Sequence, residues 1–149
     1  MVQKSSIWFN KAIDLAGLKA IKLKGLSASL EMEWVEIGPD FLKMKMPVTE
    51  HNIQPYGLLH GGACCALAET IGSVGSFLVI DHTRFFCVGM EINANHIHPV
   101  RNGYVTATAT PLHLGKSTHV WDIKMVNDEG KLICVSRHTV AIVNHHKIK

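Results

Sequence analysis

The sequence predicts an α+β protein in which a largely antiparallel sheet wraps around one long apolar helix. Hydrophobic residues make up 47% and charged residues 18% of the 149 positions, which is the balance of a globular protein. A continuous apolar stretch, residues 58–80, is long enough for a buried helix. Segments of alternating apolar and polar residues precede and follow it, as in strands. No linker or repeat divides the chain, so residues 1–149 are expected to form one domain.

The first 46 residues predict a helical segment followed by a β-hairpin. Residues 6–17, SIWFNKAIDLAG, have apolar residues at helical spacing and end in Gly17, a common helix terminator. Residues 30–37 alternate instead, the Gly-Pro-Asp of 38–40 makes a turn, and residues 41–46 alternate again. This order predicts two antiparallel strands after a helix at about 6–17.

The remaining residues predict a loop, a long helix and four strands. The loop at 47–60 is long and contains two prolines, and loops of this kind often carry function. The helix is expected from about Gly61 to Ile80. Pro111 indicates an edge or a bulge within the strand that contains it. Four β-rich segments follow the helix, at 85–96, 103–113, 118–127 and 131–143, with a turn at Asn127-Asp128-Glu129-Gly130.

Composition excludes several classes of protein. The net charge of +3 is compatible with a small anionic ligand and too weak to indicate nucleic acid. Residues 58–80 approach membrane-spanning length, but His60, Glu69 and four glycines interrupt them, so no membrane span is expected. The N-terminus shows no secretory signal, and no CxxC spacing occurs. A cytoplasmic protein with reduced, buried thiols is therefore expected; the cysteines are Cys64, Cys65, Cys87 and Cys134.

Glu69 is the candidate catalytic residue within the apolar helix. A carboxylate buried there without a cation within a helical turn costs several kcal/mol unless it is paired, protonated or used in chemistry. Ser73 follows at i+4, on the same helical face, where it could hold a water or simply pack. Capping of a neighbouring backbone, or a distant cation, is the structural alternative for Glu69.

His60, Gly61 and Gly62 open the helix with unpaired N–H groups and the positive end of the helix dipole. The Gly61 N–H could polarise a thioester carbonyl, and the side-chain amide of Gln54 could be a second donor. Two glycines can equally make only a tight turn, and His60 could be structural. Hydrolysis of a thioester requires such polarisation plus a carboxylate nucleophile or base, so these residue types fit that reaction.

The run HNIQPYGLLHGGACCALAETIGS at 51–73 strongly resembles the hotdog-fold acyl-CoA thioesterases of the phenylacetate-pathway, hydroxybenzoyl-CoA and dihydroxynaphthoyl-CoA type. VGMEINANHIHPV at 88–100 and PLHLGK at 111–116 extend the resemblance over roughly 40–149. It implies an acyl-CoA substrate, no metal and no bound cofactor, with coenzyme A arriving as part of the substrate. It also implies a homodimer with active sites shared between subunits, usually paired into a homotetramer.

Carried over position by position, the resemblance implies catalytic roles for Glu69, Gln54, His60, Gly61 and Ser73. Glu69 and Ser73 of one subunit would face Gln54, His60 and Gly61 of the other. Two departures from the family pattern concern coenzyme A: His98 replaces an arginine before Pro99, and Lys116 replaces the arginine of LHLGR. Residues expected to bind substrate or coenzyme A are Gly62, Val88, Gly89, His96, His98, His113, Lys116 and Ser117.

Three other functions fit parts of the sequence. His96 and His98 on one strand face could begin a metal site, although no third ligand has a definite spacing and the pair at 145–146 is expected to be disordered. A non-catalytic acyl-CoA binding module could share the fold, and so could a dehydratase acting on hydroxyacyl thioesters. The acyl group stays open, because the following residues fit either an acyl pocket or the core, with core favoured for Phe85 and Phe86: Tyr56, Phe77, Phe85, Phe86 and Met90.

Overall fold

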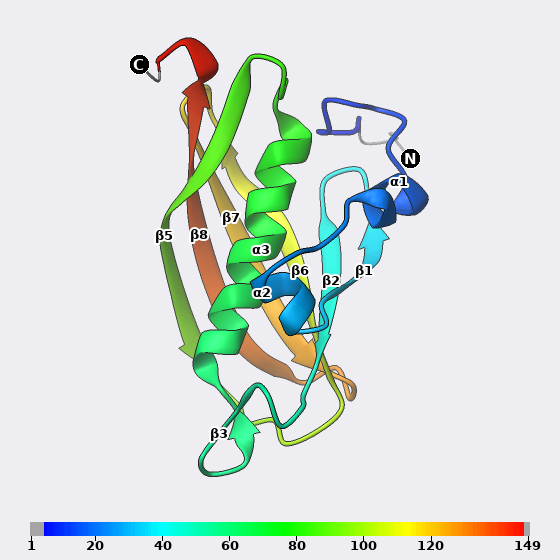
Figure 1. Ribbon diagram of the computed structural model, residues 1–149, viewed down its shortest axis with the longest axis vertical. Coiled ribbons are helices and arrows are strands. Elements are labelled where there is room, and N and C mark those ends of the chain that lie inside the picture. The colour runs from blue at the N-terminus through cyan, green and yellow to red at the C-terminus, as the bar shows by residue number, and fades with distance from the viewer. Residues whose placement is uncertain (1–4, 148–149) are drawn as a thin grey trace.

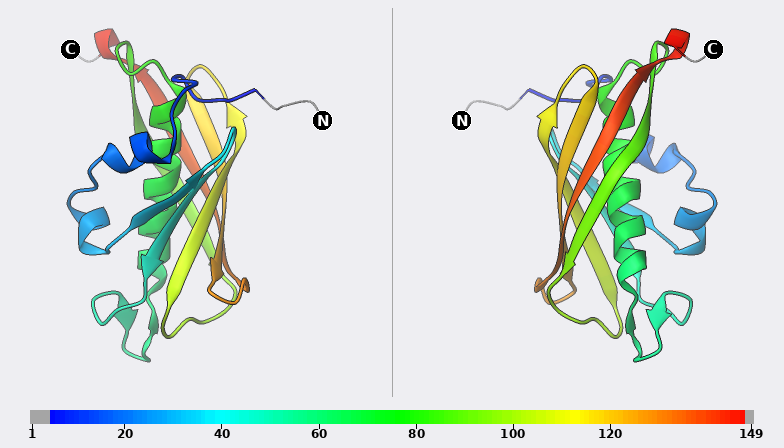
Figure 2. Two further views of the ribbon diagram at one scale, coloured as in Figure 1. Left: turned by 90° about the vertical axis from the view of Figure 1, so that its right-hand side faces the viewer. Right: turned by 90° about the vertical axis from the view of Figure 1, so that its left-hand side faces the viewer.

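A computed structural model describes residues 5–147; residues 1–4 and 148–149 of the expected domain lie outside it. Six antiparallel strands form one sheet that curves around the long helix α3 (Figures 1 and 2). The predicted α+β arrangement, a sheet wrapped around one central apolar helix, is confirmed. In sheet order the strands are β1 (Glu33–Ile37), β2 (Leu42–Pro47), β6 (Tyr104–Leu114), β7 (Thr118–Asn127), β8 (Leu132–Asn144) and β5 (Phe85–His96).

The long elements agree closely with their predicted bounds. Helix α3 spans Gly61–Val79, and the four strands after it begin and end within one residue of the expected segments. The predicted bulge lies where the β6–β7 register shifts between Pro111 and His113. The loop before α3 contains a small hairpin, β3 (Ile53–Gln54) and β4 (Leu58–Leu59), which was not predicted.

The predicted helix at 6–17 is wrong. Helix α1 spans Leu15–Ala20, and Asp14 caps its start by accepting a hydrogen bond from the Gly17 N–H at 2.8 Å. The apolar residues upstream serve packing instead: the Trp8 ring stacks on that of Trp121 with centroids 6.4 Å apart and is buried. An aspartate inside the pattern was a helix-start signal that outweighed the spacing. A further short helix, α2 (Leu26–Ser29), precedes β1.

Residues His145–Lys147 are also more ordered than expected. Residues His145–Lys147 form a 3-10 helix, η1, and the His145 N–H donates to the Arg84 carbonyl at 3.0 Å. The expectation of a disordered histidine pair is therefore wrong. The same contact joins the end of β8 to the start of β5.

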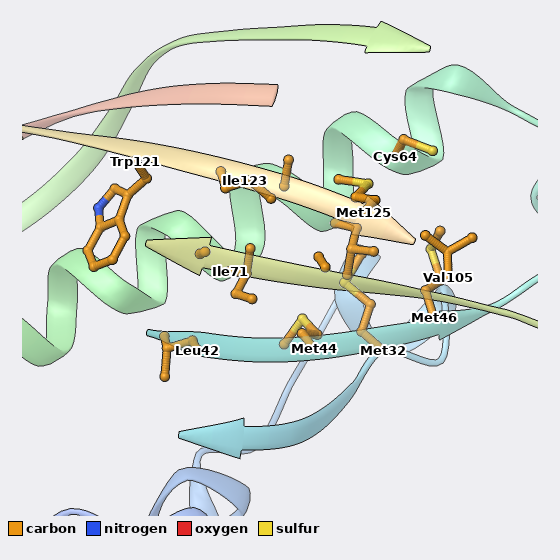
Figure 3. Close-up of a cluster of buried hydrophobic side chains, with 14 of the residues drawn as sticks. Met32, Leu42, Met44, Met46, Cys64, Ile71, Val105, Trp121, Ile123 and Met125 are labelled. Carbon is orange, nitrogen blue, oxygen red and sulfur yellow. The ribbon is translucent and has the colours of Figure 1, made fainter. Parts of the chain in front are cut away.

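Helix α3 buries one face against the sheet, where β2, β6, β7 and β8 supply the inward side chains of the core (Figure 3). The helix contributes small residues at the closest points. A Cβ on Gly75 would lie 2.9 Å from the Trp121 ring, and one on Gly72 would lie 2.8 Å from the His138 ring. The Trp121 indole N–H also donates to the Ser76 hydroxyl at 2.8 Å. Ring-to-glycine contacts therefore set the distance between α3 and the sheet.

The contact at Gly75 gives a stability prediction. Gly75→Ala should lower the free energy of unfolding by about 1–3 kcal/mol, because the added methyl group must displace a fully buried indole. Gly17→Ala is the matched control: its Cβ would meet only ordinary contacts on exposed α1, so it should add about 0.5–1 kcal/mol through helix propensity. Urea denaturation measures both. Equal effects of the two substitutions would contradict the packing described.

Helix α3 is apolar and long enough to cross a membrane by composition alone, with a mean hydropathy of 1.5. Half of its most apolar 18-residue stretch is buried within the described chain, and the helix contacts five strands of the sheet. The core helix of a soluble protein has these properties, as the interruptions at His60 and Glu69 predicted.

Candidate active site

The surroundings of Glu69 differ from those that the sequence predicted. Its side chain is exposed in the single chain and lies beside Gly89 of the edge strand β5. The expected burial of this carboxylate is therefore wrong for one chain, and so is the energetic cost that was attached to it. Ser73 lies one turn further along the same face of α3 and is half-buried. Only a neighbouring molecule on this face could bury Glu69.

Glu69 and Ser73 form one half of the candidate site together with Gly89 and His138, and we call these four residues the carboxylate half-site. A Cβ on Gly89 of β5 would lie 2.8 Å from Glu69 Oε1 and 3.0 Å from His138 Cε1. The Ser73 hydroxyl lies 3.0 Å from His138 Nε2. A cavity of about 430 Å³ opens beside Glu69 and Ser73, between α3 and α2.

A second group lies at the start of α3, and we call it the donor half-site: Gln54, Gly61, His96 and His98. These four line one cavity of about 320 Å³. Gly61 is the first residue of the helix, so its N–H has no acceptor within α3. A Cβ at this position would lie 2.6 Å from His96 Nε2, so only glycine allows the imidazole to approach. His98 is held by a 2.8 Å contact from its Nδ1 to the Leu132 carbonyl.

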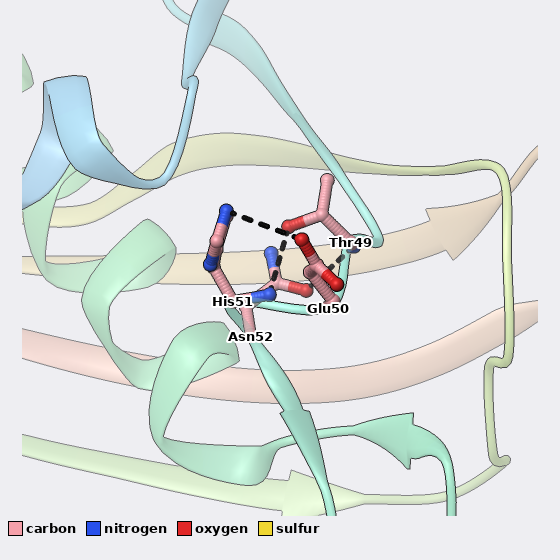
Figure 4. A network of polar contacts seen from close by, with 4 residues as sticks. All are labelled: Thr49, Glu50, His51 and Asn52. Carbon is pink, nitrogen blue, oxygen red and sulfur yellow. Dashed lines mark hydrogen bonds and ion pairs between the residues drawn. The ribbon is translucent and has the colours of Figure 1, made fainter.

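A compact turn fixes the loop that carries Gln54 (Figure 4). The Asn52 side chain is buried; its Oδ1 accepts from the Thr49 N–H at 2.9 Å, and its Nδ2 donates to the Pro47 carbonyl at 2.8 Å. The Asn52 carbonyl accepts from the His60 N–H at 2.8 Å, which ties the turn to the start of α3. Asn52 was not predicted from the sequence, although an asparagine in a loop between two prolines is a turn signal.

Hydrogen bonds within the loop before α3 determine which side-chain groups of Gln54 and His60 remain available to bind a ligand. Gln54 Oε1 accepts from the Tyr56 N–H at 3.0 Å, which leaves the amide NH₂ as a donor. His60 Nδ1 accepts from the Gly62 N–H at 2.8 Å, so His60 caps the helix. This contact supports a structural role for His60. Gly62, expected to bind substrate, lines a different cavity beside Leu26 and Leu30.

The two half-sites of one chain lie too far apart to act on one carbonyl group. Glu69 is the eighth residue after Gly61, and a rise of 1.5 Å per residue places them about 12 Å apart along α3. A carbonyl held by the Gly61 N–H therefore lies beyond the reach of the Glu69 side chain in the same chain. Both halves can meet at one substrate only when two chains contribute.

Other residues expected to bind coenzyme A lie elsewhere. Val88 is exposed on β5, the edge strand of the sheet. His113, Lys116 and Ser117 are exposed near the opposite end of α3, where Lys116 lines an apolar cavity of about 580 Å³ with Phe85. Neither Phe85 nor Phe86 belongs to the buried core, contrary to expectation.

The cysteines near Glu69 are not suited to act as nucleophiles. Burial raises the pKa of the Cys65 thiol, which lies one turn before Glu69, and burial also raises the pKa of the Cys87 thiol. Cys87 Sγ–H donates to the Ser73 carbonyl at 3.6 Å. Thiols with raised pKa values stay protonated at neutral pH. All four cysteines are free, as expected, but only Cys64 and Cys134 are buried; the expected burial is wrong for Cys65 and Cys87, which are half-buried.

His138 is the member of the carboxylate half-site that the sequence analysis missed. Strand β8 alternates, with Cys134, Ser136, His138 and Val140 buried and Arg137 exposed. This alternation was visible in the sequence and would have placed His138 on the inner face of the sheet. Within residues 5–147 no three metal-ligating side chains gather as a metal would require.

Comparison with known proteins identifies the class. The sequence profile of the thioesterase superfamily matches residues 56–134, more than half of the chain. The chain belongs to this superfamily, and its fold is the hotdog fold of a thioester hydrolase. Among curated relatives, the 1,4-dihydroxy-2-naphthoyl-CoA hydrolase of Escherichia coli is 43% identical over 92% of this chain and 99% of its own length. The proofreading thioesterase EntH of Cronobacter turicensis is 38% identical over 92% of this chain and 98% of its own length.

Solved structures agree with this assignment. A mutant thioesterase from Pseudomonas aeruginosa superposes with a TM-score of 0.88 at 42% identity, covering 93% of this chain and 99% of that one. A thioesterase from Haemophilus influenzae superposes with a TM-score of 0.86 at 42% identity, covering 94% of this chain and 99% of that one. The resemblance stated from the motifs is thereby confirmed at the level of family and fold.

Proposed function

We propose that this protein is an acyl-CoA thioesterase whose active site joins the carboxylate half-site of one subunit to the donor half-site of its partner. The observation that carries the proposal is the separation of about 12 Å along α3 between Gly61 and Glu69. It accounts for a carboxylate that is exposed in the single chain. It also accounts for two N–H donors, from Gly61 and Gln54, that line a cavity without a carboxylate.

Strand β5 is the surface that would bring two chains together. It is an edge strand of 12 residues, and its outer side exposes Val88 and Met90 at 47% and 64%. A long apolar edge of this kind pairs readily with another chain. Antiparallel pairing of two β5 strands would set the two α3 helices side by side in opposite directions. That arrangement places the start of one helix near the middle of the other.

In the proposed reaction, the Gly61 N–H and the Gln54 amide hold the thioester oxygen and stabilise the negative charge that forms on it. Glu69 either attacks the carbonyl carbon directly or takes a proton from the attacking water. In both routes the C–S bond breaks and one water is consumed. The acyl group leaves as the free acid, and coenzyme A leaves as the thiol.

The proposal also covers the binding of coenzyme A, the acyl group, the oligomeric state and the location of the protein. Exposed cationic and polar groups, His98, His113, Lys116 and Ser117, would hold coenzyme A, with Val88 and His96 lining its path. Aryl or medium-chain acyl groups are proposed as the acyl part. No metal or bound cofactor takes part. We further propose a homotetramer, a cytoplasmic location, and neither a nucleic-acid nor a membrane partner.

A thiol-release assay over a panel of coenzyme A esters tests this function. The panel contains benzoyl, hydroxybenzoyl, phenylacetyl, 1,4-dihydroxy-2-naphthoyl and straight-chain acyl groups. We expect release of free coenzyme A from at least one aryl ester, with the ranking of kcat/KM naming the acyl class. Gln54→Ala should lower kcat/KM on the best ester by about 10²–10³-fold, as the loss of an oxyanion donor does.

Two results would contradict the proposal. Binding of every ester without thiol release would favour a non-catalytic acyl-CoA binding module. Loss of water from a hydroxyacyl ester, with the thioester intact, would favour a dehydratase.

Full activity after dialysis against a chelator is expected, because the proposed chemistry uses no metal ion.

A further inference from the structure

His138 is the fully buried member of the carboxylate half-site. It lies on β8, and its exposed fraction is 0%. Its Nδ1 lies 3.0 Å from the Glu91 carbonyl on β5, and its Nε2 lies 3.0 Å from the Ser73 hydroxyl on α3. Gly72 of α3 packs against the His138 ring, so the imidazole has little room to turn. One side chain thereby joins β8, β5 and α3 beside Gly89, which also lies close to Glu69.

For a neutral imidazole, these two contacts determine where the hydrogens lie. A backbone carbonyl can only accept a hydrogen bond, so His138 Nδ1 must carry the hydrogen in that contact. In the neutral ring Nε2 then has a lone pair and accepts. The Ser73 hydroxyl must therefore donate to Nε2. Among the described residues Ser73 Oγ has no other hydrogen-bond partner, so its lone pairs are left for a ligand.

The orientation of the Ser73 hydroxyl decides what it can offer. Its only hydrogen is used by His138, so it cannot donate to the Glu69 carboxylate. Both groups are then acceptors on the same face of α3, one turn apart. A water molecule has two hydrogens and can donate one to each acceptor. Its oxygen lone pair would then point away from α3, toward the donor half-site of the other subunit.

On the basis of the thioesterase function proposed above, we propose that His138 is a positioning residue that fixes the Ser73 hydroxyl as an acceptor for the water that hydrolyses the thioester. The water donates to Glu69 and to Ser73, and its oxygen forms the new bond to the acyl carbon. The proton passes to Glu69. The C–S bond then breaks, and the departing thiolate takes up that proton. His138 itself touches neither water nor substrate.

Substitutions that separate the two imidazole nitrogens test this role. His138→Leu removes both nitrogens, and we expect kcat to fall about 10–100-fold with KM nearly unchanged. His138→Gln keeps an acceptor near the position of Nε2 and should recover part of kcat. His138→Asn keeps a polar group only near the position of Nδ1 and should resemble His138→Leu. Wild-type kcat in His138→Leu would overturn the proposal.

A double-mutant cycle shows whether His138 acts through Ser73. Ser73→Ala alone should lower kcat to a similar extent, and adding His138→Leu to Ser73→Ala should lower it no further. Losses that multiply independently would overturn the proposal. Ser136→Ala is the matched control: this buried serine on the same strand donates to the Asn93 carbonyl of β5 at 2.6 Å, away from Glu69. It should lower stability while leaving kcat unchanged.

A spectroscopic readout keeps the test independent of activity and of variant folding. Long-range ¹H–¹⁵N spectra of the wild-type protein report which nitrogen of His138 carries hydrogen. We expect the Nδ1–H tautomer, and an Nε2–H tautomer would overturn the proposal. If the wild type releases no coenzyme A from any ester, the proposed function fails, whereas the tautomer result still judges the hydrogen-bond arrangement around Ser73.

Discussion

Replacing Glu69 by glutamine is expected to lower kcat for the best coenzyme A ester by about 10²–10⁴-fold. Glutamine keeps the size and the hydrogen-bonding reach of the side chain, but it can neither take a proton from water nor attack a thioester carbonyl. KM should stay close to the wild-type value, because the proposed contacts to coenzyme A lie on other residues. Steady-state kinetics with a thiol indicator measure both quantities.

Glu36→Gln is the matched control for this experiment. Glu36 is an exposed carboxylate on β1 that pairs with Lys43 at 2.6 Å, and β1 lies at the edge of the sheet opposite β5. Its loss should leave turnover unchanged, because exposed ion pairs contribute little even to stability. Wild-type turnover in Glu69→Gln would remove Glu69 from the mechanism and leave the half-site without a catalytic carboxylate.

Mixing two inactive variants should restore activity. A Glu69→Gln chain keeps its donor half-site, and a chain with Gln54→Ala and Gly61→Ala keeps its carboxylate half-site. When the two are co-expressed, a mixed dimer has one site with both substitutions and one intact site. Random pairing makes half of the dimers mixed, so about a quarter of wild-type activity is expected. Each variant alone should retain at most about 1% of it.

Complementation distinguishes a shared site from a site within one chain. If one chain held both half-sites, the mixture would show only the mean of the two variants. Co-expression of Glu69→Gln with Glu69→Ala supplies the negative control, since neither chain brings a carboxylate. Recovery in this control would mean that wild-type protein contaminates the preparations.

Periodicity and turn residues predicted the large elements, and all of them except β5 bury a face. Strands 85–96 and 118–127 have the bounds that their composition and turns indicated, and the helix from Gly61 begins at its glycines. The N-terminal helix failed because Trp8 obeys helical spacing yet is used to stack on Trp121, a contact more than 100 residues away in sequence. Sequence spacing cannot distinguish these two uses of an apolar residue.

The sequence predicted most residues of the candidate site, but it did not predict the exposure of Glu69 or the contact between Ser73 and His138. The pairing of Glu69 with Ser73 follows from helical geometry, and the free N–H of Gly61 follows from its place at a helix start. Exposure of Glu69 could not be predicted, because whether a helix face meets a sheet or an open surface depends on tertiary packing. His138 was missed because its partner Ser73 lies 65 residues away on another element.

The two contacts between rings and glycines along α3 also restrict how the helix can move. The Trp121 ring against Gly75 and the His138 ring against Gly72 act at neighbouring points, so α3 can neither slide along the sheet nor rotate about its axis without a clash. Rotation by one residue would swing Glu69 through about 100°. The direction in which this carboxylate points is thus set by the two buried rings that pack against Gly72 and Gly75. Substitutions that enlarge Gly75 should therefore be tolerated best when Trp121 becomes smaller in the same chain, so these two positions should vary together.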